Sequence, residues 1–305
     1  MNHSSMLIQP NLHLHFHNYP YKTLHIPSNM TVYDVSDYNL QSNESVKSIQ
    51  IMPSANNVWI WSYNSVQDCR FLYIGSQSCP IFIDLSGYTN HLAVIFDADT
   101  FYSNMDTENA IYTNIHTTNS TDSNIHAANS TNPNIHTTHS IVPSILRNHV
   151  IEWKPQAQTP PYPFIDELIQ THSFDEHIKV LVNYINQYTQ CCHFPAAFQT
   201  MMDMILHTNE TFSLQDISNQ TRYSIRHINR MFNNYLGYGS KMLYKYTRFQ
   251  KVLREIINNP NRQISKFILN MNYSDQAHFQ REFKTFMGET PKTFCRQIAT
   301  IQSCH

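Results

Sequence analysis

The first hundred residues carry apolar side chains with the period of two that is typical of β-strands. Residues 58–61 alternate β-branched and tryptophan side chains, and β-branched or aromatic runs follow at residues 71–74, 81–85 and 92–96. Ser, Asn, Pro and Gly separate these runs, as they do in the turns between strands. The pattern predicts that residues 1–160 form a β-rich domain, a small antiparallel sandwich or barrel.

After a proline-rich stretch at residues 154–163, the apolar positions recur at intervals of three and four, which indicates helices. Three apolar stripes have this spacing: Phe164, Leu168 and Ile169; Ile178, Leu181, Val182 and Ile185; and Phe198, Met201, Met202 and Ile205. We expect residues 161–207 to be a helical connector, open to a role in self-association, between the β-rich domain and the C-terminal segment.

A tandem repeat of ten residues lies inside the predicted β-rich domain. Asn-Ile-His recurs at residues 114–116, 124–126 and 134–136, and the whole stretch 113–140 has almost no apolar surface. Such a composition cannot offset the conformational entropy lost on ordering, so it predicts a disordered loop. The evenly spaced histidines have no carboxylate or bulky core around them, which favours expansion of a neutral loop over a metal site.

A second, diverged repeat covers the C-terminal third of the chain. Residues 208–298 match themselves at an offset of 51 residues. The matched pairs are Ile217 with Ile268, Ile228 with Phe279, Arg230 with Arg281, Phe232 with Phe283, Gly237 with Gly288 and Lys241 with Lys292. The offset predicts two copies of one supersecondary unit.

Each copy has the pattern of a helix, a tight turn and a second helix. Ser213 and Asp216 fit a capping box at the start of the first helix, and Ser224 and Asp275 stand where the second helices begin. In the first copy, Gly237 follows the second helix and can end it in the left-handed conformation. The predicted buried stripes are Leu214 and Ile217; Ile225, Ile228, Met231 and Phe232; and Phe279 and Phe283.

A linker helix is predicted between the two copies. Ser240 can cap it, and its apolar positions are Leu243, Tyr246, Phe249, Val252 and Ile256. One continuous helix would hold the two copies in a fixed relation.

The outward positions of the two second helices carry side chains that can read bases. They are Arg226, Asn229 and Arg230 in the first copy, and Gln276, Ala277, Gln280 and Arg281 in the second. Arg, Asn and Gln make paired hydrogen bonds to guanine or adenine in the major groove. From residue 208 onward there are 14 basic and 6 acidic residues, a net charge of +8, against −10 for residues 1–207. This asymmetry favours a polyanion-binding module on an acidic body.

The segments FSLQDISNQTRYSIRHINRMFNNYLGYGSKMLYKYTRFQKVLREI and QISKFILNMNYSDQAHFQREFKTFMGETPKTF resemble the DNA-binding domain of the AraC/XylS family of bacterial transcription regulators. The resemblance covers residues 208–298 and leaves 299–305 as a tail. It implies an α+β protein with an all-α C-terminal domain, in which two recognition helices enter successive major grooves. Residues 1–160 resemble the cupin-like sensor or dimerisation domains of such regulators.

The resemblance implies a cytoplasmic regulator of transcription whose partner is double-stranded DNA. RNA polymerase, a second copy of the chain and a small-molecule effector remain open as partners, and no cofactor or membrane partner is expected. Three departures from the family pattern stand out. Asn272 replaces a turn glycine, Ser218 and Ile268 replace small alanines, and Ala277 can contact only a thymine methyl group.

Two other function classes are alternatives to a DNA-binding regulator with a sensor or dimerisation domain. A metal-dependent cupin enzyme would use His13, His15 and His17, which alternate along one predicted strand, but no carboxylate lies in that strand to complete a facial triad. No nucleophile elbow, P-loop or dinucleotide fingerprint occurs, so an enzyme is not expected. The other alternative, an N-terminal domain that serves only protein interaction, stays open.

Overall fold

The structure is a computed structural model that describes residues 20–25, 29–35, 48–96, 100–103, 111–114, 147–153, 162–188, 190–207, 213–259, 264, 268 and 271–303. The strand predicted around His13, His15 and His17 and the histidines of the decapeptide repeat lie outside these residues.

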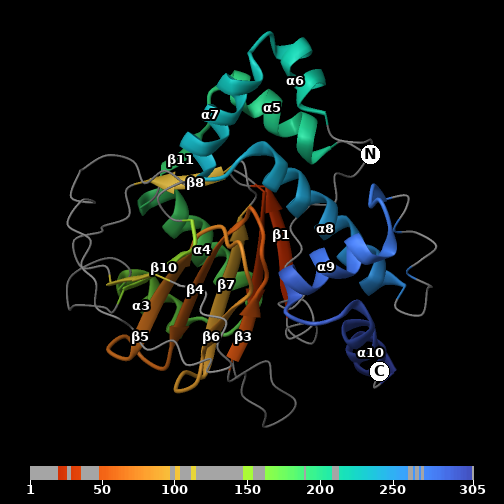
Figure 1. The fold of residues 1–305 in the computed structure, drawn as a ribbon. Helices are drawn as coiled ribbons and strands as arrows, with labels where there is room; N and C mark the ends of the chain where they lie inside the picture. Colours follow the sequence, from red (N-terminus) through yellow and green to blue (C-terminus); the bar gives the residue numbers. More distant parts are fainter. Residues whose placement is uncertain are drawn as a thin grey trace.

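The N-terminal half is built on a seven-stranded antiparallel sheet with the order β1-β2-β7-β4-β5-β10-β9 (Figure 1). Its strands are β1 (Tyr21–His25), β2 (Asn29–Asp34), β4 (Asn57–Tyr63), β5 (Cys69–Ile74), β7 (Asn90–Phe96), β9 (Ile111–Asn114) and β10 (His149–Trp153). Two small two-stranded sheets accompany it: β3 (Ser48–Ile51) with β6 (Ile81–Asp84), and β8 (Thr100–Ser103) with β11 (Gln190–His193).

The two faces of the large sheet carry two separate cores, because side chains alternate across a strand. On β4, Trp59, Trp61 and Tyr63 belong to one core, while Val58 and Ile60 belong to the other. The second core also contains the inward residues of β3 and β6, so these strands cover that face of the sheet. The result is a small sandwich, one of the two architectures, sandwich or barrel, that the strand pattern predicted.

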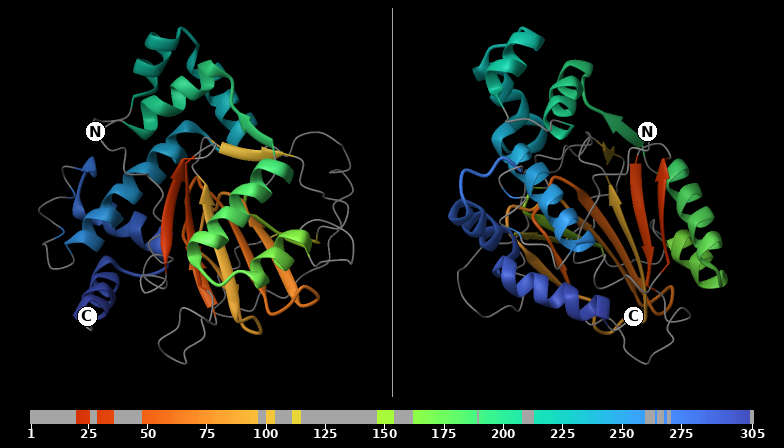
Figure 2. Two further views of the ribbon diagram at one scale, coloured as in Figure 1. Left: turned by 180° about the vertical axis from the view of Figure 1, so that it is seen from behind. Right: turned by 90° about the vertical axis from the view of Figure 1, so that its right-hand side faces the viewer.

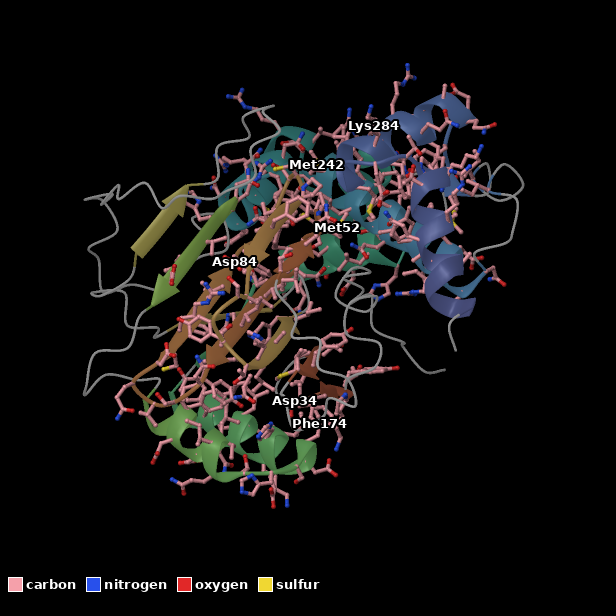
Figure 3. The ribbon with its side chains drawn as sticks, turned by 90° about the horizontal axis from the view of Figure 1, so that it is seen from below. Asp34, Met52, Asp84, Phe174, Met242 and Lys284 are labelled. Atoms are coloured by element: carbon pink, nitrogen blue, oxygen red, sulfur yellow. The ribbon has the colours of Figure 1, made fainter. Side chains whose placement is uncertain are left out.

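Helices α3 (Tyr162–Gln170) and α4 (Phe174–Tyr188) cover the other face of the sheet (Figure 2). Phe164 and Leu168 of α3 are buried, whereas Ile169, the third residue of this apolar stripe, is 36% exposed. Helix α4 is also tied to β2, where His177 Nδ1 lies 2.5 Å from Asp34 Oδ2 in a buried contact. Figure 3 shows Asp34 near the start of α4.

The C-terminal half is all helical, which confirms the α+β class. Its elements are α5 (Ala196–Leu206), α6 (Leu214–Thr221), α7 (Ile225–Leu236), α8 (Ser240–Asn258), α9 (Gln276–Met287) and α10 (Pro291–Ser303). The four predicted apolar residues of α5 are buried in the same core as α6 to α10. Of the predicted helical stripes, two therefore pack on the sheet and the third packs with the C-terminal helices.

The two halves meet through the strand β3 and the residues after it. Met52 is fully buried in the core of the C-terminal helices, and Ala55 packs against the same core. Figure 3 shows Met52 where the strands approach these helices, and Figure 2 shows the C-terminal helices on the side of the sheet opposite α3 and α4.

Candidate nucleic-acid interface

The first helix-turn-helix unit consists of α6, a tight turn and α7. The Ser213 hydroxyl accepts a hydrogen bond from the Asp216 backbone N–H, and the Ser224 hydroxyl accepts one from the His227 backbone N–H. Both predicted N-caps are therefore confirmed. Arg222 in the turn has φ +59°, and Gly237 ends α7 with φ +74°, the left-handed conformation predicted for it.

One face of α7 packs into the core through Ile228, Phe232 and Leu236. Ile225 departs from its predicted place in this stripe, since its side chain is 38% exposed. The physical reason is its position: it is the first residue of α7, and the turn residues before it are themselves exposed. Tyr223 is 36% exposed and its ring stacks on His227 at 4.8 Å.

The predicted base-reading residues of α7 differ in their surroundings. Arg226 and Arg230 are exposed, and Arg230 Nη2 lies 3.0 Å from His227 Nδ1. Asn229 is half-buried, and its Oδ1 accepts a hydrogen bond of 3.3 Å from the Ser240 hydroxyl.

Ser240 was predicted to cap α8, but Gly239 holds that position and makes no side-chain cap. The Ser240 side chain instead joins α8 to α7.

The first helix predicted for the second unit lies largely outside the described residues. Its second helix, α9, begins after the N-cap Asp275, whose carboxylate accepts a hydrogen bond from the His278 backbone N–H, as predicted. Asn272 has φ +59°, which confirms that this asparagine adopts the left-handed turn conformation. The four predicted outward residues, Gln276, Ala277, Gln280 and Arg281, are all exposed, while Phe279 and Phe283 are buried.

A buried ion pair joins α9 to the linker helix α8. Arg248 Nη2 donates to both carboxylate oxygens of Glu282 at 2.8 and 2.7 Å, and the Tyr273 hydroxyl donates to Glu282 Oε1 at 2.8 Å. The Arg248 guanidinium also lies 4.0 Å from the centre of the Tyr273 ring. Burial by itself would lower the pKa of Arg248, but Tyr273 and Glu282 outweigh it and raise that pKa, so the guanidinium is firmly charged.

Sequence reasoning missed this ion pair, although the repeat contains a signal for it. At the offset of 51 residues, Glu282 falls on Met231, a residue of the predicted buried stripe. It is also the sole acidic residue in the sequence of α9. A carboxylate at a core position needs a cationic partner, which the sequence alone did not identify as Arg248.

Basic side chains dominate the exposed surface of the two units. Within the described residues 213–303, the exposed basic residues are Arg222, Arg226, Arg230, Lys241, Lys245, Arg281, Lys284, Lys292 and Arg296. The exposed acidic residues there are Asp216 and Asp275. Both acids lie in the first turn or at the N-cap of a helix, where a negative charge is favourable.

Residues 217–297 match the family described as "Helix-turn-helix domain". This segment is an AraC-type helix-turn-helix domain. The match includes α7, α8 and α9 and therefore all seven predicted base-reading residues. An AraC-type domain supports the assignment of the protein to the DNA-binding regulators of transcription. No curated protein sequence matches this chain.

Solved structures of ToxT from Vibrio cholerae are distantly similar in structure to this chain. An apo form from strain SCE256 is 8% identical and covers 88% of this chain and 97% of its own, with a TM-score of 0.44. ToxT of strain O395 is 12% identical and covers 91% and 98%, with a TM-score of 0.40. Unsaturated fatty acid bound ToxT is 10% identical and covers 88% and 94%, with a TM-score of 0.38. The similarity is too distant to assign ToxT's ligand to this chain.

The search for other sites covers only the residues that the structure describes. No three His, Cys, Asp or Glu residues among them are grouped so that they could hold a metal ion. No helix among them is both long and apolar enough to cross a membrane. The metal hypothesis for His13, His15 and His17 concerns residues outside this part of the chain.

Proposed function

We propose that this protein is a sequence-specific transcriptional regulator that inserts α7 and α9 into successive major grooves of DNA. The observation that supports the proposal is that α7 and α9 share three features. Each begins after a residue whose side chain caps the helix, buries an apolar stripe that includes phenylalanine, and exposes Arg or Gln over its first two turns. The N-terminal residues of a recognition helix are those that contact base edges.

On α7, Arg226 and Arg230 are placed to donate paired hydrogen bonds to guanine, or to contact phosphates. The amide nitrogen of Asn229 stays available for adenine N7, while its oxygen, which has two lone pairs, already accepts from Ser240. The exposed side chain of Ile225 supplies an apolar surface for a thymine methyl group.

On α9, Gln276, Gln280 and Arg281 offer the polar contacts, and Ala277 offers a methyl group alone. Each helix offers three polar side chains, but α7 has two arginines and α9 has one, and bidentate contact from arginine to guanine is the commonest specific contact. We expect the strongest sequence preference in the half-site that α7 reads.

The length of the linker helix determines how far apart the two recognised base clusters lie on the DNA. Its 19 residues correspond to a rod of about 28 Å, and successive major grooves on one face of DNA repeat every 34 Å or so. A single chain with both recognition helices on one face of the duplex would thus read two base clusters about 10 base pairs apart.

The N-terminal β-rich domain is proposed to control this activity, as a sensor of a small-molecule effector or as a dimerisation domain. Its support is charge: residues 1–160 hold 5 basic and 11 acidic residues, a net charge of −6, which disfavours contact with DNA. A cytoplasmic location follows from DNA binding in a bacterial cell. If light scattering shows one monomeric mass for the full chain, and a thermal-shift screen finds no ligand, this part of the proposal is contradicted.

Salt-dependent binding of the full-length protein tests the DNA-binding part. If about 6 phosphates are neutralised, log K falls against log[salt] with a slope near −5. The matched control is Arg70→Met, which removes a basic side chain of the β-rich domain and leaves the slope unchanged. Affinity that does not change between about 50 and 200 mM salt contradicts the proposal.

A further inference from the structure

The β-rich domain contacts the C-terminal ends of both recognition helices. Arg147, just before β10, donates from Nη1 to the carbonyl oxygen of Gly237, the C-cap of α7. Gln50 of β3 donates from Nε2 to the carbonyl oxygen of Met287, the last residue of α9, at 3.4 Å. The last carbonyl groups of a helix have no partner within the helix, and a cation is favourable beside them.

The contact with α7 is reinforced by aromatic side chains. The Arg147 guanidinium lies 5.4 Å from the centre of the Tyr238 ring, and Tyr238 packs edge-on against Tyr246 of α8 at 5.6 Å. Both tyrosines are almost fully buried, and burial raises the pKa of each phenol well above its ordinary value. Both rings therefore stay neutral, and Tyr238 offers its face to the guanidinium.

Arg147 projects from a rigid part of the β-rich domain. The next residue, Asn148, has φ +58°, and its backbone N–H donates to Ser76 O at 2.9 Å. Its side-chain oxygen accepts from the backbone N–H and the hydroxyl of Ser78 at 2.8 and 2.9 Å. The backbone next to Arg147 is thus held by contacts within the β-rich domain and not by the helices that its side chain contacts.

The contacted ends are far from the base-reading ends. Helices α7 and α9 each have 12 residues, which makes them about 18 Å long. Arg226 and Gln276 lie at the first end of each helix, and Gly237 and Met287 lie at the other. The acidic domain can therefore hold both helices while their first turns lie in the grooves.

We propose that Arg147 and Gln50 are positioning residues for DNA recognition, which fix the relative orientation of α7 and α9. This inference rests on the proposed function. Two helices held from one rigid domain accept a single spacing of base clusters, whereas helices held by α8 alone tolerate neighbouring spacings.

The test uses full-length protein and a duplex selected by the parent chain from randomised DNA. Affinity is measured for this duplex and for versions with one base pair inserted or deleted between the two base clusters. One base pair rotates one cluster by about 35° relative to the other. The variants are Arg147→Met, which keeps an apolar stem, Gln50→Met and the double variant. The melting temperature of each reports whether it folds.

Arg70→Met is the matched control. Arg70 also donates to a backbone carbonyl, that of Asp84, and lies over a tyrosine ring, that of Tyr88 at 5.0 Å, but all these partners belong to the β-rich domain. A general loss of stability would affect this control as much as Arg147→Met.

We expect the parent and the control to lose about tenfold or more in affinity at the altered spacings. In the double variant that loss falls below about threefold, because each helix can then follow its own groove. Unchanged spacing dependence in the double variant, or an equal loss of affinity at every spacing, would overturn the proposal. Failure of the proposed function gives a different result, since the parent itself would then select no sequence.

Discussion

The two helix-turn-helix units come from one sequence repeat, yet the protein secures them by different physical means. In the first unit, Phe232 of α7 packs edge-on against Phe198 of α5 with ring centres 4.8 Å apart, an apolar contact between uncharged side chains. In the second unit, Glu282 of α9 accepts two hydrogen bonds from Arg248 of α8, which is a charge-assisted contact.

The comparison shows that the repeat specifies which face of the second helix of each unit is buried. It does not specify which other helices the unit contacts. The buried pairs Ile228 with Phe279 and Phe232 with Phe283 keep the same stripe in both units. Met231 and Glu282 occupy equivalent positions of the repeat, but the methionine side chain is apolar and the glutamate side chain is a charged carboxylate. The first unit therefore has an attachment to α5, a helix outside the repeat, whereas the second unit has an ion pair with the linker helix α8.

The largest effect is expected from removing α5. A fragment of residues 208–305 lacks four buried side chains of the shared core, Phe198, Met201, Met202 and Ile205, whereas a fragment of residues 190–305 keeps them. Large side chains cost about 2 to 5 kcal/mol each when truncated in a core. We expect the longer fragment to unfold cooperatively in urea and the shorter one to be largely unfolded. Equal stability of the two fragments would show that α5 does not secure the first unit.

The next largest effect is expected at the ion pair. Glu282→Gln leaves the buried Arg248 charge without its carboxylate, which costs about 3 to 5 kcal/mol of stability. The control is the double variant Arg248→Met with Glu282→Leu, in which neither charge remains and the loss is smaller. Chemical denaturation of the three proteins measures both. A double variant that is less stable than Glu282→Gln would contradict the assigned role of the pair.

The internal design of the units could be predicted from the sequence because its signals are local. The caps at Ser213, Ser224 and Asp275 and the left-handed Gly237 lie within a few residues of the backbone groups that they serve. Ile225 was wrongly placed in the buried stripe because periodicity does not show where a helix loses its packing partner. The Arg248–Glu282 pair was missed because it joins residues 34 positions apart. The contacts of Arg147 and Gln50 span still longer separations, which no local pattern records.

A smaller effect is expected at the first N-cap. Ser224→Ala removes the acceptor for the His227 backbone N–H and costs about 1 kcal/mol. Because a hydroxyl does not titrate in this range, the loss should be the same at neutral and acidic pH. Ser224→Asp restores the acceptor and serves as the control, and thermal unfolding at several pH values measures both. A loss that changes with pH would contradict this interpretation of the cap.

The smallest effect, expected at the second N-cap, depends on pH. The hydrogen bond from the His278 backbone N–H holds the pKa of Asp275 below its ordinary value of 3.8. A lowered pKa in the folded state means that the carboxylate stabilises the protein above its unfolded pKa and loses this effect as pH falls through the folded value. The difference in melting temperature between the parent and Asp275→Ser should be constant above about pH 5 and should change in favour of the serine variant below about pH 4. A difference that is independent of pH would contradict the assigned cap.

Selection on randomised duplex DNA with the full-length parent, Arg226→Ala and Gln280→Ala tests most directly whether one chain reads two adjacent major grooves. We predict that the parent selects two base clusters about 10 base pairs apart. Arg226→Ala should relax the preference in one cluster, at a cost of about 1 to 3 kcal/mol if the contact to the base is bidentate, and Gln280→Ala should relax the other cluster alone. Unchanged sequence preferences in both variants would contradict the assignment of α7 and α9 as the recognition helices.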